Sequence, residues 1–300
     1  MKPIVKDSFD ESENSAKNRK RLTRKAKRII SLSLILSLLA ALCVSIYVSN
    51  YCLKITKESI ESNKVDTPIR LALISDMHTR SFGNNNEKLI NSVAAELPDV
   101  ILLAGDIVSN DSTEDNDFKY VHNLVFELSK IAPVYFSIGN HERFNPYVET
   151  ICSFVRSAGG IILDEEYQDI LIKGNSVRIG GLSYYRFWDE ESNAYLQNFT
   201  NADKDTFTLL LCHNPEFYVW GIKNYNIDLI ASGHTHGGMV KLPLLGPLYA
   251  PEQGWLPEYA AGLYESECGG HMAVTTGLGS SPEFLPRIFN RPEIMIIDVE

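Results

Sequence analysis

Five short apolar segments between residues 69 and 232 are each followed, within two residues, by an aspartate, asparagine or histidine, and this pattern restricts the fold more than any other feature. Between the first three lie two segments with helical spacing of apolar residues, Asn86–Leu97 and Phe118–Ile131. Short buried strands that alternate with helices predict an α/β fold with parallel strands at its centre. The five strand-like segments are Ile69–Ser75, Val100–Ala104, Val134–Ile138, Thr206–Cys212 and Ile227–Ser232.

The second half of the chain adds strands of another kind. Asp169–Ile172 and Val177–Leu182 flank the residues Lys-Gly-Asn-Ser, which is a hairpin signal. Two further strand-like runs are Met272–Thr276 and Ile294–Val299. Mixed parallel and antiparallel pairing favours two sheets over one. Residues 243–258 are rich in proline and glycine, and we predict an irregular surface loop there.

The residues that follow the five segments are of the types that bind divalent metal ions. In open α/β sheets the carboxyl ends of the strands form the ligand crevice, so these side chains should meet although they span 160 positions. Carboxylate, amide and imidazole groups suit Mn, Fe and Zn, and seven of them exceed the needs of one catalytic ion. We therefore expect two ions that share one carboxylate, an arrangement suited to displacement at phosphorus. The candidate ligands are Asp76, His78, Asp106, Asn140, His213, His234 and His236.

Each of these motifs is a weak indication when it stands alone. Asp-x-His is common by chance, Gly-Asp after a strand is usually a turn, and a single histidine such as His213 is more often packed in a core. The order of the five motifs and their shared position at strand ends favour a metal site over five coincidences.

Residues 29–48 form an apolar run of 20 residues without a charge, IISLSLILSLLAALCVSIYV. A helix of this length is about 30 Å long, which matches the hydrocarbon core of a bilayer. We predict an uncleaved transmembrane anchor at residues 29–49, because a signal peptide usually has a shorter apolar region and a small-residue cleavage site, and no convincing site follows here. A cleaved signal peptide is the main alternative, and a buried core helix is the third.

Charge is unevenly distributed along the chain. Residues 1–28 hold ten Lys/Arg and four Asp/Glu, a net charge of +6, so the rest of the chain carries −16 within a total of −10. Basic flanks stay on the cytoplasmic side, which predicts a cytoplasmic tail at 1–28 and a body outside the cell membrane. An acidic body repels nucleic acid, and no nucleic-acid partner is expected. Residues 50–66 are polar and predict a linker to a folded domain at 67–300.

The ordered motifs Asp-x-His, Gly-Asp, Gly-Asn-His-Glu, His and Gly-His-x-His resemble the calcineurin-like metallophosphoesterase family over about residues 67–300. Within that family, the chain looks like a bacterial membrane-associated branch of predicted phosphohydrolases. This finer similarity is carried by Ser232-Gly-His-Thr-His-Gly-Gly, the Leu-Pro that follows, Thr276-Gly-Leu-Gly and Asn290-Arg-Pro-Glu. The resemblance implies a sandwich of two mixed β-sheets flanked by helices.

The resemblance also implies a role for each candidate residue. One ion would be held by Asp76, His78 and His236, and the other by Asn140, His213 and His234, with Asp106 bridging both. His141 would not bind metal but would stabilise the transition state or protonate the leaving oxygen. In two positions the chain departs from the family pattern. Glu142 stands where many members have an aspartate that orients the catalytic histidine, and we expect the longer glutamate side chain to reach the same imidazole. Met239 stands where the branch usually has glutamine.

The activity implied is hydrolysis of phosphoester bonds by hydroxide activated between two divalent ions. The predicted location makes phosphodiesters such as phospholipid or envelope head groups the expected substrates. The alternatives are a phosphomonoesterase or nucleotidase acting on soluble substrates, and a metal-binding scaffold without turnover. A protease is excluded by the absence of His-Glu-x-x-His. Other residues that could line the crevice are more often packing or surface groups: Arg80, Tyr184, Tyr185, Trp188 and Arg287.

Overall fold

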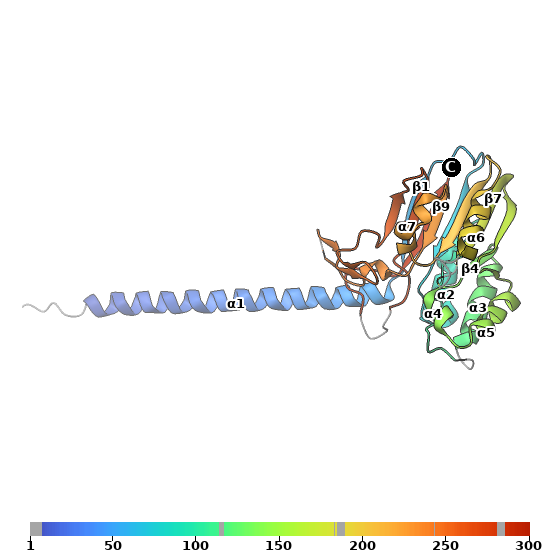
Figure 1. Ribbon diagram of the computed structural model, residues 1–300. Helices are drawn as coiled ribbons and strands as arrows, with labels where there is room; N and C mark the ends of the chain where they lie inside the picture. Colours follow the sequence, from blue (N-terminus) through green and yellow to red (C-terminus); the bar gives the residue numbers. More distant parts are fainter. Residues whose placement is uncertain (1–7, 114–116, 183, 185–189, 243, 281–285) are drawn as a thin grey trace, which may run out of the picture. The chain divides into compact units, whose positions relative to one another are not determined.

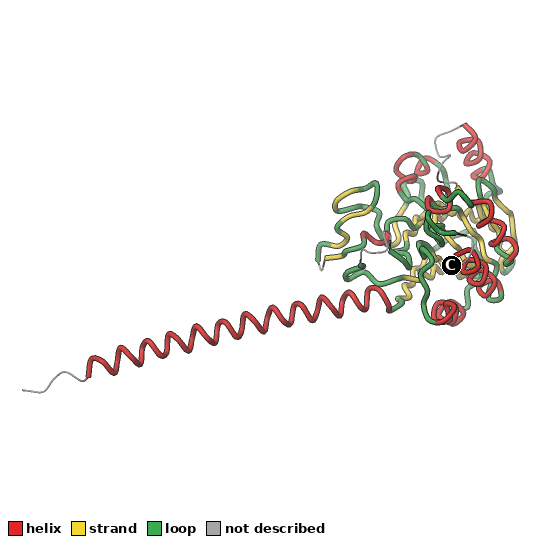
Figure 2. Tube along the Cα trace, turned by 90° about the horizontal axis from the view of Figure 1, so that it is seen from below, coloured by secondary structure: helices red, strands yellow, loops and turns green. Residues whose placement is uncertain are grey.

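The computed structural model describes residues 8–300 except residues 114–116, 183, 185–189, 243 and 281–285. The chain divides into two compact units, residues 1–46 and residues 47–300. One continuous helix, α1 (Ser8–Tyr51), makes up the described part of the first unit and contributes its last residues to the second (Figure 2).

Helix α1 contains an apolar stretch, Thr23–Tyr51, of 29 residues, within which the most apolar window of 18 residues has a mean hydropathy of 2.7. Its most apolar window is only 6% buried, which excludes a core helix. The length and composition are sufficient to cross a membrane, and a signal sequence would have the same properties. The anchor predicted at residues 29–49 lies inside this stretch.

Six strands form the first sheet of the second unit, in the order β1-β16-β2-β3-β4-β5. The strands from β2 to β5 run parallel, and β16 pairs antiparallel with β2 and parallel with β1. The bounds are β1 (Lys54–Ile60), β2 (Ile69–Ile74), β3 (Val100–Leu103), β4 (Val134–Ser137), β5 (Ile161–Leu163) and β16 (Glu293–Val299).

The second sheet also has six strands, in the order β14-β15-β9-β8-β7-β6. The four inner strands are parallel, and an antiparallel partner closes each end. Both sheets therefore mix parallel and antiparallel pairs, which confirms the predicted architecture. The bounds are β6 (Tyr167–Ile172), β7 (Asn175–Leu182), β8 (Phe207–Cys212), β9 (Leu229–Ser232), β14 (Gly262–Glu265) and β15 (His271–Val274).

Central strands are buried on both faces because each sheet has the other sheet on one side and helices on the other (Figure 1). In β2, Leu71 and Leu73 lie in the core between the sheets, whereas Ala72 and Ile74 lie in the core under the helices. This alternation follows from the two-residue period of a strand. Helices α2 (Glu87–Ala95), α3 (Asp117–Ser129) and α5 (Val148–Ser157) cover the first sheet, and α6 (Glu190–Thr200) and α7 (Glu216–Trp220) cover the second.

The prediction that residues 50–66 are a linker is wrong. Residues 54–60 form β1, which pairs with the C-terminal strand β16 along its whole length. The sequence of this strand, KITKESI, is mostly polar and therefore resembles a spacer, and most of its side chains are exposed or half-buried. Polar, lysine-containing strands are typical of sheet edges, where charge discourages pairing with another chain.

The irregular loop predicted at residues 243–258 is partly ordered into two short hairpins. β10 (Lys241–Leu242) pairs with β11 (Gly246–Pro247), and β12 (Tyr249–Ala250) pairs with β13 (Gly254–Trp255). We call the described residues 241–242 and 244–256 the hairpin segment. Its strands have two residues each, and strands this short show no alternation of apolar and polar residues in the sequence.

A chain beginning at residue 67 should be less stable than one beginning at residue 52, because it lacks β1 and the buried side chains of Ile60 and Val65. Each aliphatic side chain contributes about 1.5–3 kcal/mol on burial. A loss of about 3 kcal/mol or more corresponds to a drop of at least about 6 °C in the unfolding midpoint for a domain of this size. Calorimetry of both chains checks this, and equal midpoints would contradict a structural role for β1.

Candidate metal centre

The seven candidate ligands come together where the carboxyl ends of five strands meet. β2, β3 and β4 belong to the first sheet, and β8 and β9 to the second. Six of the seven side chains are buried and only Asn140 is partly exposed. Five of the seven backbones have positive φ, which for residues other than glycine is strained and common at functional sites. These five are Asp76, His78, Asp106, His234 and His236.

One group of donors consists of Asp76, His78 and His236, each of which offers one atom within 4.8 Å of the others. The Nε2 atoms of His78 and His236 face each other at 3.3 Å. Burial lowers the pKa of both rings to about 3, so both are neutral and can offer lone pairs. Two nitrogen ligands about 2.1 Å from a tetrahedral ion are roughly 3.4 Å apart, so this pair fits a divalent metal.

A second group consists of Asp106, His213 and His234, again with one donor atom each within 4.8 Å. Asn140 completes it, because its Oδ1 lies 3.1 Å from Nε2 of His213 and 3.0 Å from Nδ1 of His234. Burial acts to lower the pKa of His213, but Asp106 at 3.1 Å raises it to about 10. Nε2 of His213 and Oδ2 of Asp106 therefore face each other as two potential metal donors.

Asp106 lies between the two groups. It belongs to the second group and also forms a cluster with His78 and His141. Burial acts to raise the pKa of Asp106, but His213 outweighs it and holds the carboxyl ionised. Close packing depends on Gly139, since a Cβ there would lie 2.3 Å from Oδ1 of Asp106. A carboxylate shared in this way can bridge two ions.

The His213 ring is held in position from behind. Its Nδ1 lies 2.6 Å from the carbonyl oxygen of Ala104, so Nδ1 carries the proton and Nε2 faces the centre. A hydrogen bond of this kind fixes the tautomer and orientation that metal binding requires.

His141 lies beside Asp106 and His78 and is partly exposed. Its Nδ1 accepts a hydrogen bond from the backbone N–H of Asn110 at 3.1 Å. A neutral imidazole that accepts at Nδ1 carries its proton on Nε2. That Nε2 lies 4.0 Å from Oδ2 of Asp106, so the proton points into the centre.

The expectation that Glu142 orients His141 is wrong. The Glu142 carboxylate accepts hydrogen bonds from the backbone N–H groups of Asp106, Ile107, Val108 and Gly139 at 2.7–3.1 Å. Consecutive residues of a helix point about 100° apart, so in α4 (Asn140–Phe144) Glu142 turns away from the ring that precedes it. Burial raises its pKa to about 7.

Arg287 was not assigned a role from the sequence, and the structure places it behind the His236 loop. Its guanidinium is fully buried and donates to the backbone carbonyls of Asn290 at 3.0 Å and His236 at 3.3 Å, and to those of Gly279 and Thr276. The hydrogen-bond partners of Arg287 among the described residues are backbone carbonyls, and such partners leave no signal in a sequence.

Glu252 is a second residue that sequence reasoning missed. It lies in the hairpin segment, accepts from Asn214 at 2.6 Å and Tyr184 at 2.9 Å, and lies 4.0 Å from Nε2 of His234. Its position in an apparently irregular loop concealed it. Tyr185 and Trp188, also considered for the crevice, lie outside the described residues.

A family model described as calcineurin-like phosphoesterase matches residues 69–238, which include all seven candidate ligands and His141. The uncharacterized metallophosphoesterase YkuE of Bacillus subtilis is 26% identical over 266 residues, 85% of this chain and 88% of that protein. An uncharacterized metallophosphoesterase of Aquifex aeolicus is 26% identical and covers 85% and 94% of the two chains. Phosphodiesterase YaeI of Escherichia coli is 27% identical and covers 77% and 82%.

Replacing Glu142 with glutamine should destabilise the centre, because an amide offers one accepting oxygen to four N–H groups. Hydrogen bonds to a buried charge contribute about 1.5–3 kcal/mol, so we expect the unfolding midpoint to fall by about 3–12 °C and bound metal to decrease. Thermal unfolding and metal analysis check both effects. The matched control is Glu149→Gln on the exposed face of α5, and equal behaviour of the two variants would contradict the assigned support.

Proposed function

Because this chain belongs to the calcineurin-like phosphoesterase family, we propose that it is a membrane-anchored hydrolase of phosphodiesters. Metal-dependent phosphoester hydrolysis and a centre of two divalent ions are properties of the family. Our proposal concerns the substrate preference, the roles of the individual residues and the location.

The observation that carries the proposal is the sharing of Asp106 between two groups of donors. One ion would be held by Asp76, His78 and His236, and the second by the remaining three ligands, Asn140, His213 and His234. Asp106 would bridge them. The donors are oxygen and nitrogen only, which suits Mn, Fe or Zn.

When bound, the two ions supply Lewis acidity and an activated water for attack at phosphorus. His141 donates the proton to the leaving group. The Asn110 N–H keeps the proton on Nε2, which faces the centre and can donate to the departing alcohol oxygen. His141 is therefore the catalytic residue of the proposal. Glu142 holds the backbone from Asp106 to Val108, so its role is positioning.

The last turn of α1 belongs to the second unit and forms hydrogen bonds within it, which supports an anchor that is not cleaved. Asn50 donates to the carbonyl of Arg287 at 3.0 Å and accepts from its N–H at 3.3 Å. Ser49 accepts from the N–H of Asn290 at 3.0 Å. Cleavage after the apolar stretch would remove these contacts from buried groups.

The basic residues before the apolar stretch favour a topology with a single crossing of the cell membrane, the N-terminus in the cytoplasm and the catalytic domain outside it. An active domain tethered at that surface meets phospholipid and other envelope head groups first. The relative named phosphodiesterase YaeI supports a diester as substrate.

Asp106→Asn should abolish turnover and reduce bound metal below two ions, because the amide cannot bridge two cations as a carboxylate does. The full chain and the variant are loaded with Mn, Zn, Fe, Mg or no metal, and each is assayed on a generic phosphodiester and a phosphomonoester. Cleavage of the diester alone supports the proposal. Preference for the monoester would instead indicate the phosphatase or nucleotidase alternative, and loaded metal without turnover would indicate the scaffold.

His141→Ala should lower kcat by about 10²–10⁴, the usual contribution of a positioned general acid, while metal content stays near two. His122→Ala on α3 is the matched control and should change kcat less than twofold. Loss of metal in His141→Ala would overturn the assigned role and make this histidine a ligand.

A further inference from the structure

The hairpin segment exposes several large apolar side chains. Leu244 and Leu245 are 106% and 68% exposed, and Trp255 and Leu256 are 75% and 65% exposed. Tyr249 is half exposed and packs edge to face against Trp255 with ring centroids 5.8 Å apart. Apolar side chains gathered on one exposed segment mark a surface that contacts a partner or a membrane.

This segment is joined to the end of α1 by a short connection, residues 288–290. The N–H of Lys241 donates to the carbonyl of Ile288 at 3.0 Å, next to a β-bridge between Val240 and Ile288. Two residues further, the N–H of Asn290 donates to Ser49 in the last turn of α1. Figure 1 shows the hairpins, in orange, on the side of the second unit where α1 ends.

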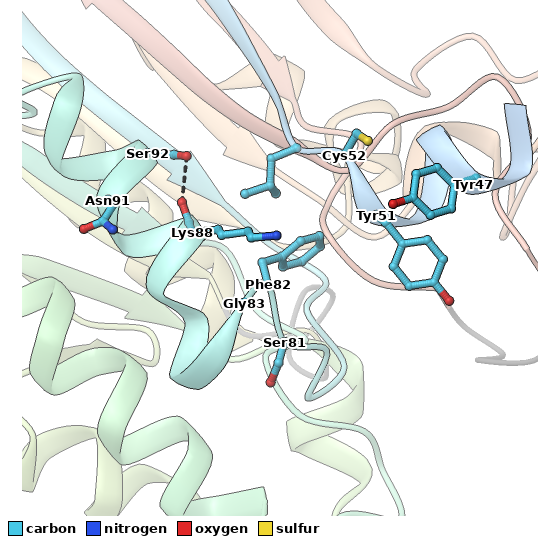
Figure 3. A pocket seen from close by; sticks show the side chains of 10 residues that line it. Tyr47, Tyr51, Cys52, Ser81, Phe82, Gly83, Lys88, Asn91 and Ser92 are labelled. Atoms are coloured by element: carbon cyan, nitrogen blue, oxygen red, sulfur yellow. Dashed lines mark hydrogen bonds between the residues drawn. The ribbon is translucent and has the colours of Figure 1, made fainter. Parts of the chain in front are cut away.

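The end of α1 has the composition of a membrane interface. Tyr47 and Tyr51 are 62% and 65% exposed and line a pocket of about 640 Å³ together with Phe82 and Lys88 (Figure 3). The Arg80 guanidinium lies 5.5 Å from the centre of the Tyr51 ring. Tyrosines and basic residues at the end of an apolar helix are typical of head-group level.

Basic side chains gather around the start of the hairpin segment, although residues 29–300 carry a net charge of −16. Lys54, Lys241 and Arg291 line a pocket of about 340 Å³ beside the half-exposed ring of Phe289. Lys54 lies 3.5 Å from Glu293, whereas Lys241 forms no ion pair with any described residue. Basic groups next to exposed apolar groups complement an anionic lipid surface.

We propose that the hairpin segment is a second membrane contact, which places Leu244, Leu245 and Trp255 among the head groups of the bilayer crossed by α1. The partner is a bilayer that contains anionic phospholipid, and the inference rests on the proposed anchor. Glu252 lies between β12 and β13 and contacts Asn214 and the surroundings of His234. The membrane contact of the hairpin segment therefore also connects the metal centre to the membrane surface.

The test uses the full chain in vesicles of phosphatidylcholine and phosphatidylglycerol, with and without bromine on the upper part of the acyl chains. Bromine quenches tryptophan that lies close to it. We expect Trp255→Phe to lose at least half of the bromine-dependent quenching of the wild-type chain. Trp220→Phe on α7, where Trp220 is 42% exposed, is the matched control and should keep it. Trp188 is retained in all three proteins.

Flotation of the vesicles separates the possible failures. A chain that does not float with the vesicles would overturn the anchor and this proposal together. A chain that floats but is quenched equally with and without Trp255 would overturn the hairpin contact alone. Hydrolysis of a soluble diester, measured in parallel, reports on the proposed activity independently of both.

A second variant, Leu244→Asp with Leu245→Asp, should reduce the quenching of Trp255 at least twofold and leave hydrolysis of a soluble diester within twofold of wild type. Both residues are exposed, so the fold should tolerate the change. Leu171→Asp in β6, at a site that is 77% exposed, is the control and should leave the quenching unchanged. Equal quenching in the double variant and the control would overturn the proposal.

Discussion

Two carboxylates and four imidazoles lie buried within a few ångströms of one another at the junction of the two sheets. Buried polar groups of this kind are stable only when a partner compensates for the water they have lost. Among the described residues, part of this compensation comes from protons, as in the pair of Asp106 and His213. Divalent cations would compensate for the lost hydration of all these donors at once, so the packing of the two sheets favours metal binding.

Two buried charges hold the loops that carry these donors, and they are opposite in sign. Glu142 accepts from backbone N–H groups of the loop after β3. Arg287 donates to backbone carbonyls around the loop after β9. Each charged side chain forms its hydrogen bonds with backbone groups and therefore fixes the path of the chain. This path includes the positive φ values with which the ligand residues face the centre. The geometry of the centre thus depends on residues that do not face it.

The strands that carry the ligands could be predicted because they are short apolar runs, and the rule that parallel strands present their carboxyl ends together predicted that Asp76 and His236 would meet. β1 could not be predicted, since an edge strand that is polar on most positions has the composition of a linker. The partners of Glu142 and Arg287 were also beyond prediction. Both bind main-chain atoms, which are common to all residues and leave no signal in a sequence. The position of Glu252 depends on strands of two residues, which are too short to show an alternation of apolar and polar residues.

The same backbone network that supports the centre also reaches the helix. Arg287 donates with its side chain to the carbonyl of His236, and its own backbone N–H and carbonyl pair with Asn50 in the last turn of α1. One residue thus connects the end of the apolar helix to a loop of candidate ligands. Polar side chains at the end of an apolar helix would ordinarily be hydrated, and here Ser49 and Asn50 are buried against the catalytic domain instead. Their burial without compensation would be costly, so the last turn of α1 and the His236 loop stabilise each other.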